Sequence, residues 1–322
     1  MLDEMTGKPS EKIILVVPAF NEEENIAPFV EEAKKHLGAF NWGILFVNDG
    51  SRDGTWKQIL AQSQVNPNIH GICLARNFGH QNAIKAGLEA AVHFPADAYI
   101  TLDADLQHPI SLIPEMVEQW KKGVHIVQSQ RQDAGRPISL VKKHTSRLFY
   151  AVFSWLSNVP IQPGMSDFRL IDRSTLEFVN NCEDKDFFLR GMLPWSGLST
   201  VVMPYAPAER IHGSSKFTMK KMCDLALSGI VGYSTRPLHL AIVIGLIAIT
   251  LAFLYFLYVI VVVCIGIDVS LGWPSVIACI LGLGGIQLFI LGIMGIYLGK
   301  LFMEHKSRPT YVIAERTFGQ AR

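Results

Sequence analysis

Two uninterrupted apolar stretches near the C-terminus most constrain what this chain can fold into. The first covers residues 238–267 ("LHLAIVIGLIAITLAFLYFLYVIVVVCIGI") and the second residues 275–299 ("SVIACILGLGGIQLFILGIMGIYLG"), and neither contains a charged residue. Each is longer than the roughly 20 residues that a helix needs to cross the hydrocarbon core of a bilayer. Because only "DVSLGWP" separates them, the sequence predicts a transmembrane hairpin with spans at about 238–264 and 275–299.

The charges that flank these stretches predict the orientation of the hairpin. The basic residues on its two flanks are Lys216, Lys220, Lys221 and Arg236 before the first span, and Lys300, Lys306 and Arg308 after the second. The connecting loop contains no Lys or Arg. Positive charge stays on the cytoplasmic side of a membrane, so both termini are expected in the cytoplasm. The polar N-terminus "MLDEMTGKPSEK" lacks the apolar core of a secretory signal peptide.

Net charge and cysteine spacing exclude some other classes of protein. The formal net charge of +1 gives no reason to expect a nucleic-acid partner. The five cysteines are scattered and form no CxxC or Cys/His pattern: Cys73, Cys182, Cys223, Cys264 and Cys279. This spacing favours a reduced, cytoplasmic setting without disulfides or a zinc site.

The first 210 residues alternate between strand-like and helix-like segments. The strand-like runs are "KIILVVPAF", "NWGILFVNDG", "NIHGICLARN" and "DAYITLDAD", and the helical segments are expected at 22–37, 53–64, 80–93 and 111–122. Asn21 is the expected N-cap of the first helix. This alternation predicts a mostly parallel α/β sheet. Such sheets bind ligands at the carboxyl ends of their strands, where "PAFNEEE", "NDGSRDGT" and "DADLQHP" fall.

The stretch "YITLDADLQHP" places Asp103 and Asp105 directly after one of these strands. Residues two apart on a strand point to the same side, so the two carboxylates would converge if the extended conformation continues. A divalent cation is the usual remedy for such a pair. The alternative is a solvated strand end, where Asp is common.

Asp49 also follows a strand, in "VNDGS". Its carboxylate can accept hydrogen bonds from the N–H groups of a nucleotide base, or it can simply stabilise an Asx turn. The chain has neither a P-loop motif nor GxGxxG, which disfavours an NTPase or a Rossmann dehydrogenase.

Basic residues that could neutralise phosphate lie in two further places. The segment "AERIHGSSKF" contains Arg210, Ser215 and Lys216, and Arg131 follows a strand-like run. Arg can bind phosphate in a bidentate manner, and Lys adds a point charge. The alternative for the first segment is a basic patch that only sets membrane topology. The amphipathic residues 139–159 are expected to form a helix, either in the membrane interface or packed on the sheet.

One more acid stands out in "GMSDFRLIDR", where Asp167 lies two residues before Arg169. The residues alone leave two interpretations open. Asp167 and Arg169 could form a structural ion pair, or Asp167 could be a catalytic carboxylate.

Seven motifs, in order between about residues 12 and 312, resemble those of the polyisoprenyl-phosphate glycosyltransferases of glycosyltransferase family 2. They are "VVPAFNEEENI", "VNDGSRDGT", "RNFGHQNAIKAGL", "LDADLQHP", "SDFRLIDR", "AERIHGSSKF" and the two-span C-terminus that ends in "SRPTY". The likeness is greatest to the bactoprenol glucosyl transferases of bacteria. The aminoarabinose-transferring enzymes and the dolichol-phosphate mannose synthases are more distant relatives.

This resemblance implies a GT-A fold and a role for each matching residue. The residues implied around the base and ribose of the nucleotide are Pro18, Ala19, Asn21, Glu23, Asp49, Asp103 and Ala104. Asp103, Asp105 and Gln107 are implied to hold Mg²⁺ or Mn²⁺, and Asp167 matches the catalytic Asp. The residues implied to bind phosphate are Arg131, Arg210, Ser215 and Lys216. The chain departs from the common pattern at Ser166, where relatives commonly have Gly, and at His80, where they often have Lys.

The domains expected from this resemblance are a cytoplasmic GT-A domain (1–212), a juxtamembrane segment (213–236), the two spans (237–300) and a cytoplasmic tail (301–322). The implied reaction moves a sugar from a UDP-sugar to polyprenyl phosphate at the bacterial inner membrane and inverts the anomeric configuration. Glucose is the first candidate for the sugar. The acceptor phosphate is already largely ionised near neutral pH, so Asp167 is expected to orient a substrate more than to act as a base.

The sequence leaves several alternatives open. The transferred sugar could be aminoarabinose, an N-acetylhexosamine or mannose instead of glucose. A processive synthase would normally show a QxxRW-type motif and more spans, and a glycosidase would use two carboxylates and water. A non-catalytic scaffold for a lipid-sugar flippase would need none of the acidic and basic clusters. A homo-oligomer and a flippase partner are compatible with the transferase.

Overall fold

The structure is a computed structural model that describes residues 11–132, 164–185, 187–206, 232, 234–265, 272–306 and 308–319. The described residues belong to two compact units. Of the described residues, 11–132, 164–185, 187–206 and 308–319 form the sheet unit, and 232, 234–265 and 272–306 form the hairpin unit. The amphipathic segment 139–159 and most of the juxtamembrane segment 213–236, both predicted from the sequence, lie outside the described residues.

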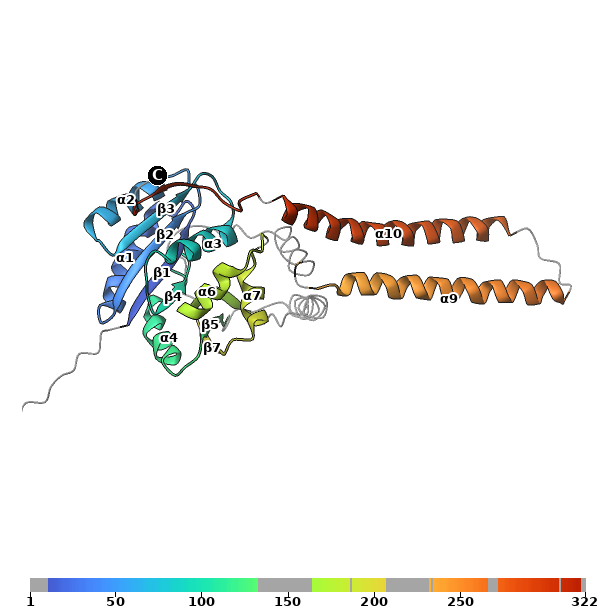
Figure 1. Cartoon of the computed structure of the whole chain (residues 1–322), viewed down its shortest axis with the longest axis horizontal. Coiled ribbons are helices and arrows are strands. Elements are labelled where there is room, and N and C mark those ends of the chain that lie inside the picture. The colour runs from blue at the N-terminus through green and yellow to red at the C-terminus, as the bar shows by residue number, and fades with distance from the viewer. Residues whose placement is uncertain are drawn as a thin grey trace, which may run out of the picture. The chain divides into compact units, whose positions relative to one another are not determined.

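The sheet unit is built on one mixed sheet, whose strands in the described residues run in the order β7-β5-β6-β4-β1-β2-β3-β8 (Figure 1). The strands are β1 (Lys12–Ala19), β2 (Asn41–Asn48), β3 (Ile69–Leu74), β4 (Ala98–Thr101), β5 (Ile126–Arg131), β6 (Met165–Asp172), β7 (Thr200–Tyr205) and β8 (Ile313–Arg316). The four strands predicted from the sequence, β1 to β4, pair in parallel. β6 is antiparallel to both β4 and β5. The predicted α/β fold with a mostly parallel sheet is confirmed.

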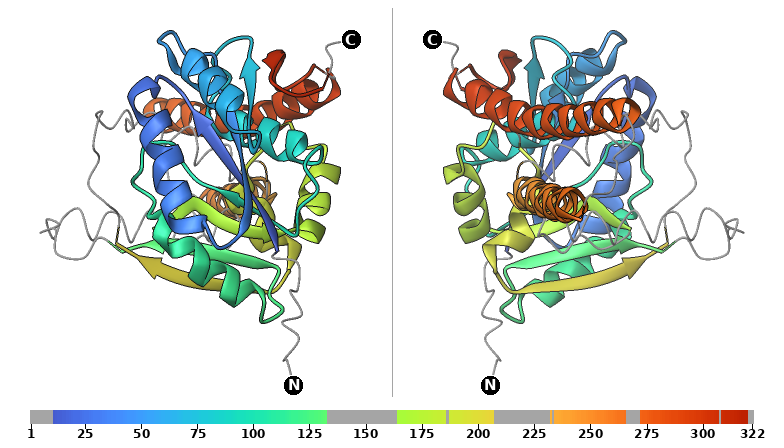
Figure 2. Two further views of the ribbon diagram at one scale, coloured as in Figure 1. Left: turned by 90° about the vertical axis from the view of Figure 1, so that its left-hand side faces the viewer. Right: turned by 90° about the vertical axis from the view of Figure 1, so that its right-hand side faces the viewer.

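Helices cover both faces of this sheet (Figure 2). They are α1 (Glu23–Leu37), α2 (Thr55–Val65), α3 (His80–Ala91), the 3₁₀ turn η1 (Ile110–Leu112), α4 (Ile113–Trp120), α6 (Arg173–Asn181) and α7 (Leu189–Ser196). Buried side chains of α1, α2 and α4 form one core with the sheet, and those of α3, α6 and α7 form the other. The four predicted helical segments are confirmed.

The predicted N-cap of the first helix is wrong. The residue that precedes α1 is Glu22, and its side chain makes no capping hydrogen bond. Asn21 instead has a left-handed backbone (φ 55°), and its side-chain oxygen accepts a hydrogen bond from the backbone N–H of Arg52 at 3.0 Å. The Asn21 side-chain oxygen therefore binds the loop after β2 and does not cap α1.

The C-terminal segment after α10, predicted only as a tail, returns to the sheet. β8 pairs antiparallel with β3, and three side-chain hydrogen bonds fasten the segment. Trp56 Nε1 donates to Glu315 at 2.8 Å, and the Gly71 N–H donates to Thr317 Oγ1 at 2.9 Å. Tyr311 donates a hydrogen bond to Glu89 on α3. Residues 308–319 are thus part of the sheet unit.

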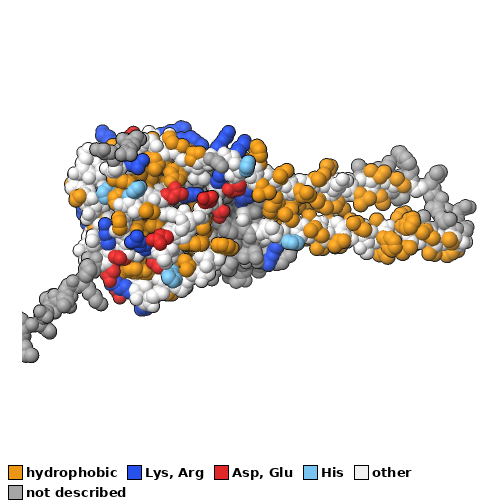
Figure 3. Space-filling model, viewed as in Figure 1, with side chains coloured by type: hydrophobic (Ala, Val, Ile, Leu, Met, Phe, Trp, Pro, Cys, Tyr) orange, Lys and Arg blue, Asp and Glu red, His pale blue; other side chains and the backbone are white. Residues whose placement is uncertain are grey.

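The hairpin unit consists of two long apolar helices, α9 (Arg236–Cys264) and α10 (Trp273–His305). By length and composition, Arg236–Val262 and Gly282–His305 are candidate membrane spans. Almost none of either span is buried, and hydrophobic side chains cover their surface in Figure 3. Exposed apolar surface of this extent is unfavourable in water and favourable in lipid.

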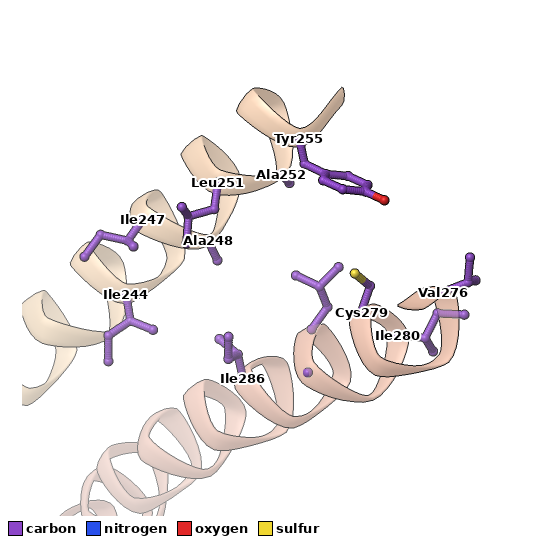
Figure 4. Close-up of a pocket in the computed structure, with 12 residues that line it drawn as sticks. Ile244, Ile247, Ala248, Leu251, Ala252, Tyr255, Val276, Cys279, Ile280 and Ile286 are labelled. Atoms are coloured by element: carbon purple, nitrogen blue, oxygen red, sulfur yellow. The ribbon is translucent and has the colours of Figure 1, made fainter. Parts of the chain in front are cut away.

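A cleft of about 810 Å³ separates part of α9 from α10. Ile247 and Leu251 line it from α9, and Cys279 and Ile286 line it from α10 (Figure 4). Nearer the start of α9, Tyr297 of α10 donates a hydrogen bond to the backbone oxygen of Ser234 at 2.6 Å. The two predicted apolar helices are therefore present in the structure.

Candidate active site

The strand register brings several of the predicted site residues to one edge of the sheet. Pro18 and Ala19 end β1 opposite the end of β2, and the Asp49 N–H donates to the Ala19 oxygen at 2.9 Å. In the antiparallel β4–β6 pair, Thr101 lies opposite Arg169. Thr101 Oγ1 also donates to the backbone oxygen of Asp167 at 2.6 Å, which places Asp167 beside the end of β4.

The two loops that follow β1 and β2 are tied together by hydrogen bonds. The Asn21 N–H donates to Ser51 Oγ at 2.9 Å, and the Gly54 N–H donates to Glu23 Oε2 at 2.8 Å. The Glu22 N–H donates to Thr55 Oγ1 at 2.9 Å. Asn21 and Glu23, both predicted to line a nucleotide pocket, thus fix the two loops relative to each other.

Asp49 is 3% exposed and organises the loop before α3. Its two oxygens accept hydrogen bonds from the backbone N–H groups of Phe78 at 2.7 Å and Gly79 at 3.0 Å. Burial raises the pKa of the Asp49 carboxyl, and these two hydrogen bonds oppose that effect in part. The Asx-type contact in this turn is made by Asn48, whose Oδ1 accepts from the Ser51 N–H. Asp49 therefore sets the position at which His80 begins α3.

The extended conformation expected through Asp103 and Asp105 does not continue. β4 ends at Thr101, and Leu106 adopts a left-handed backbone (φ 58°) that a branched side chain seldom takes. Asp105 Oδ1 accepts from the Gln107 N–H at 3.1 Å, within this turn. The strand-based reason for the convergence of the two carboxylates is therefore wrong, because a turn and not a strand carries them.

Asp103 is held from two sides, one for each carboxylate oxygen. Oδ2 accepts from His108 Nε2 at 3.2 Å, and His108 Nδ1 lies 2.9 Å from the Tyr205 hydroxyl. Oδ1 lies 3.6 Å from His80 Nε2. Burial would raise the pKa of Asp103, but the charge of His80 and the contact with His108 hold it below its usual value. Asp103 is therefore an ionised carboxylate in a fixed orientation.

The residues around Asp103 fit a divalent cation. Asp103 Oδ1 is buried and has no hydrogen-bond partner among the residues that the structure describes, so one lone pair is available to a ligand. The nearby oxygens of Asp105 and Gln107 are the hard donors that Mg²⁺ and Mn²⁺ prefer. Gln107 Oε1 also accepts from Arg131 Nη1 at 3.5 Å. Within the described ranges no cluster of three or more acidic, His or Cys side chains forms a metal site.

Asp167 lies on β6, 4% exposed, in a cluster of cationic and amide groups. Arg169 Nη2 donates to Oδ1 at 2.9 Å. Arg190 of α7 binds both oxygens, from Nε at 3.0 Å and from Nη2 at 2.8 Å. His80 Nε2 lies 3.1 Å from Oδ2, and Gln81 Nε2 donates to the same oxygen at 3.4 Å. The predicted structural Asp–Arg pair is present, and it is part of a larger cluster.

These contacts determine the charge state of the cluster. Burial alone would raise the pKa of Asp167, but the charge of Arg190 and then the contacts with His80 and Arg169 hold it well below its usual range. Burial would lower the pKa of His80, yet Asp103 and Asp167 raise it to about 9. His80 thus connects the two carboxylates as an imidazolium at neutral pH.

The sequence did not reveal several of these contacts. Arg190 and Tyr205 were not among the predicted site residues, because they reach the site from α7 and β7, outside the matched motifs. His108 lies within the motif "LDADLQHP" but was not assigned a role. Ser166, a departure from the common family pattern, fits the sheet because its hydroxyl lies 2.6 Å from Ser129 Oγ. Of the predicted phosphate-binding residues, Arg210, Ser215 and Lys216 lie outside the described residues.

Comparison with known proteins gives one family for the chain. The model of glycosyl transferase family 2 matches residues 14–179. A prophage bactoprenol glucosyl transferase homolog of Escherichia coli (strain K12) is 38% identical over 94% of this chain and 98% of its own length. The bactoprenol glucosyl transferase of Shigella phage SfX is also 38% identical, over 95% and 99%. One similar solved structure is glucosyl-3-phosphoglycerate synthase from Mycobacterium tuberculosis in complex with Mn²⁺, UDP-glucose and phosphoglyceric acid. The match covers 69% of this chain and 78% of the synthase chain at 19% identity, with a TM-score of 0.42.

Proposed function

Because this chain belongs to glycosyl transferase family 2, we propose that it transfers a sugar from a nucleotide sugar to the phosphate of a membrane polyprenyl lipid. Glucose from UDP-glucose is the first candidate. The observation that carries the proposal is the match to bactoprenol glucosyl transferases, which extends over 94% of the chain and so includes both apolar helices. A lipid acceptor gives a physical reason for these helices, because the isoprenoid tail remains in the bilayer.

The interlocked loops after β1 and β2 form the proposed nucleotide pocket. Pro18, Ala19, Asn21 and Glu23 would line it together with Asp49, and Ala104 would close it beside Asp103. Their mutual hydrogen bonds preorganise the pocket, which lowers the entropy lost when a nucleotide binds.

The proposed cation site consists of Asp103, Asp105 and Gln107. When bound there, Mg²⁺ or Mn²⁺ would stabilise the negative charge of the departing nucleoside diphosphate. The His108–Tyr205 contact orients Asp103 toward this site and prevents rotation of its carboxylate.

Asp167 is proposed to hold cations in place instead of removing a proton. Both of its oxygens accept hydrogen bonds from Arg190, and its pKa lies well below the usual range. Such a carboxylate is a weak base. The acceptor phosphate needs little help, since its second pKa is near 6. The phosphate oxygen can attack the anomeric carbon directly from the face opposite the diphosphate, which inverts the configuration.

The basic side chains are proposed to meet the phosphates of donor and acceptor. Arg131 lies beside Gln107, at the cation site. Arg210, Ser215 and Lys216 are proposed for the same role on the basis of the sequence motif alone.

The two apolar helices are proposed to anchor the enzyme in the bacterial inner membrane with both termini in the cytoplasm. A cysteine at position 270, in the connecting loop, should react with an impermeant thiol reagent added to cells with a permeable outer membrane. A cysteine at position 51, in the sheet unit, should react only after lysis. The native cysteines are first replaced, and the opposite labelling pattern would refute this topology.

The function is tested with the purified full-length protein in lipid nanodiscs. It is incubated with polyprenyl phosphate, Mg²⁺ or Mn²⁺, and a panel of radiolabelled nucleotide sugars, with polyprenol lacking the phosphate as the matched control. The expected product is a lipid-linked sugar that forms only with the phosphorylated lipid. Release of free sugar without lipid would favour a glycosidase, and no turnover of any donor by the folded protein would favour a non-catalytic scaffold.

A further inference from the structure

Gln287 is a polar side chain in the middle of helix α10, within a candidate membrane span. Trp273 and Lys300 stand near the two ends of this helix, and both residue types are common at the membrane–water interface. Gln287 lies midway between them, about 20 Å along the helix from each, since a helix rises about 1.5 Å per residue. The side chain of Gln is far shorter than that distance, so its amide cannot reach the interface.

The amide of Gln287 has no partner in the part of the chain that the structure describes. The side chain is exposed and makes no hydrogen bond to a described residue. Two other polar side chains of the hairpin are already paired: Thr250 Oγ1 donates to the backbone oxygen of Leu246 at 2.8 Å, and Tyr297 donates to that of Ser234. In the hydrocarbon core, an amide without a hydrogen bond is costly because no water can replace the missing partner. Gln287 therefore points to a partner outside this hairpin.

A second copy of the same helix supplies that partner without any further group. An amide carries both a donor and an acceptor, so two Gln287 side chains can each donate to the other. Where two copies pack around a two-fold axis, the same residue of each copy can meet at the axis. Lipid tails offer no hydrogen-bonding group, and an unrelated protein would need a matching polar group at the same depth in the bilayer.

The surface beside Gln287 permits close approach of a second helix. Gly284 precedes it by one turn on the same side of α10, since residues three apart are neighbours on a helix. Apart from α10 itself, no described atom lies within 4 Å of the position that a Cβ at Gly284 would occupy. Small residues of this kind let two membrane helices come close enough for their polar side chains to form hydrogen bonds.

We propose that α10 is the interface between two copies of this chain, joined inside the bilayer by hydrogen bonds between their Gln287 amides. This inference goes beyond the proposed function and rests on it only for the placement of the hairpin in the membrane. No substrate takes part, so the association should occur without nucleotide sugar or polyprenyl phosphate.

The experiment counts copies of the full chain in liposomes by single-molecule photobleaching, over a range of protein-to-lipid ratios and without substrate. Each chain carries one fluorophore at its N-terminus. The variants are Gln287→Leu, Gln287→Asn and, as a matched control, Thr250→Val, which removes a hydroxyl that is already bonded within α9. A carbonate wash of the membranes checks that each variant is inserted.

Gln287→Leu should raise the dissociation constant of the dimer by about 10- to 300-fold, the loss of two interhelical hydrogen bonds at about 0.6–1.7 kcal/mol each. Gln287→Asn keeps the amide on a shorter side chain, so it should lose less affinity than Gln287→Leu. Thr250→Val should stay within about twofold of the parent, because its hydroxyl is not at the interface.

Cross-linking tests the face of α10 in variants that keep Gln287. In a chain whose native cysteines are replaced, a cysteine at position 291 lies one turn after Gln287 on the same side of the helix. A cysteine at position 289 lies about 200° around the helix from Gln287. Under mild oxidation in membranes, Leu291→Cys should form a disulfide-linked dimer and Phe289→Cys should not.

Three outcomes would overturn the inference. They are a parent protein that is monomeric at every ratio, a Gln287→Leu variant that dimerises as tightly as the parent, and equal cross-linking at positions 289 and 291. A monomeric parent would mean that a different protein covers this surface.

Failure of the proposed function can be told apart from failure of this inference. Sugar transfer is assayed separately, and its absence would leave the dimer of the parent unchanged. Release of the parent by the carbonate wash would instead refute both the membrane placement and the dimer inside the bilayer.

Discussion

Asp167→Asn should destabilise the sheet unit strongly and leave the shape of the pH–rate profile unchanged. The carboxylate is 3% exposed in its side chain and contacts Arg169, Arg190 and His80. An Asn side chain offers one carbonyl oxygen and no charge. Its NH₂ group would face guanidinium donors, so contacts would be lost and a donor–donor repulsion would appear.

The expected loss of stability follows from the burial of Arg169. Its guanidinium would remain almost fully enclosed without a counter-ion, and removal of one partner from a buried ion pair costs about 3–5 kcal/mol. A change of 1 kcal/mol moves the unfolding midpoint of a domain of this size by about 2–4 °C. The variant should therefore unfold about 6–20 °C below the parent.

The assay is thermal unfolding of the full chain in detergent, with Asp184→Asn as the control. Asp184 is exposed, so its replacement should change the unfolding free energy by less than about 0.5 kcal/mol. Activity is then measured between pH 5 and 9, below the midpoint of the variant. Asp167 has a pKa well below the usual range, so it should contribute no acidic limb in that window. An unchanged midpoint, combined with loss of an acidic limb in Asp167→Asn, would show that Asp167 acts as a general base.

Three other predictions concern single positions. Gly50→Ala should destabilise the fold by more than about 1 kcal/mol, because its φ is +61° and a Cβ would lie 2.3 Å from the backbone of Arg76. Gly123 has a φ of +94° and open space around it, so Gly123→Ala should show only the smaller cost of backbone strain in the same unfolding assay. Asp172→Ala should lower the free energy of unfolding by about 1 kcal/mol at pH 7, because Asp172 caps α6. Burial raises the pKa of the Asp172 carboxyl, but hydrogen bonds lower it more. The loss of stability should therefore be complete above about pH 4 and disappear as the pH falls through the lowered folded-state pKa. Asp105→Asn should weaken Mn²⁺ binding in the presence of UDP by at least about tenfold in calorimetry, and an unchanged affinity would exclude Asp105 as a ligand.

The sequence was sufficient for the parts of the fold that depend on local pattern. The alternation of apolar strands with helical segments predicted β1 to β4 and the helices between them, since each segment shows its own hydrophobic period. The carboxyl ends of parallel strands meet by necessity, so Asp49 and Asp103 were correctly expected at one edge of the sheet.

Contacts between distant segments could not be predicted in the same way. The antiparallel return of β6 beside β4 places Asp167 at the end of β4, and no local pattern encodes that pairing. Arg190 lies on a short helix whose sequence "LRGMLPWS" contains no motif. The turn at Leu106 depends on a left-handed backbone that Leu rarely adopts, so propensity favoured the extended chain that was predicted there.

The pairing of β8 with β3 has a consequence for the order in which this protein is made. β8 follows α9 and α10 in the chain, so the ribosome completes both apolar helices before it supplies the last strand of the sheet. Until then β3 is an open edge, with unpaired backbone groups that can recruit a strand from another nascent chain. Completion of the sheet unit therefore waits for synthesis of the hairpin, and a chain that terminates within α10 would leave the ribosome with its sheet unfinished.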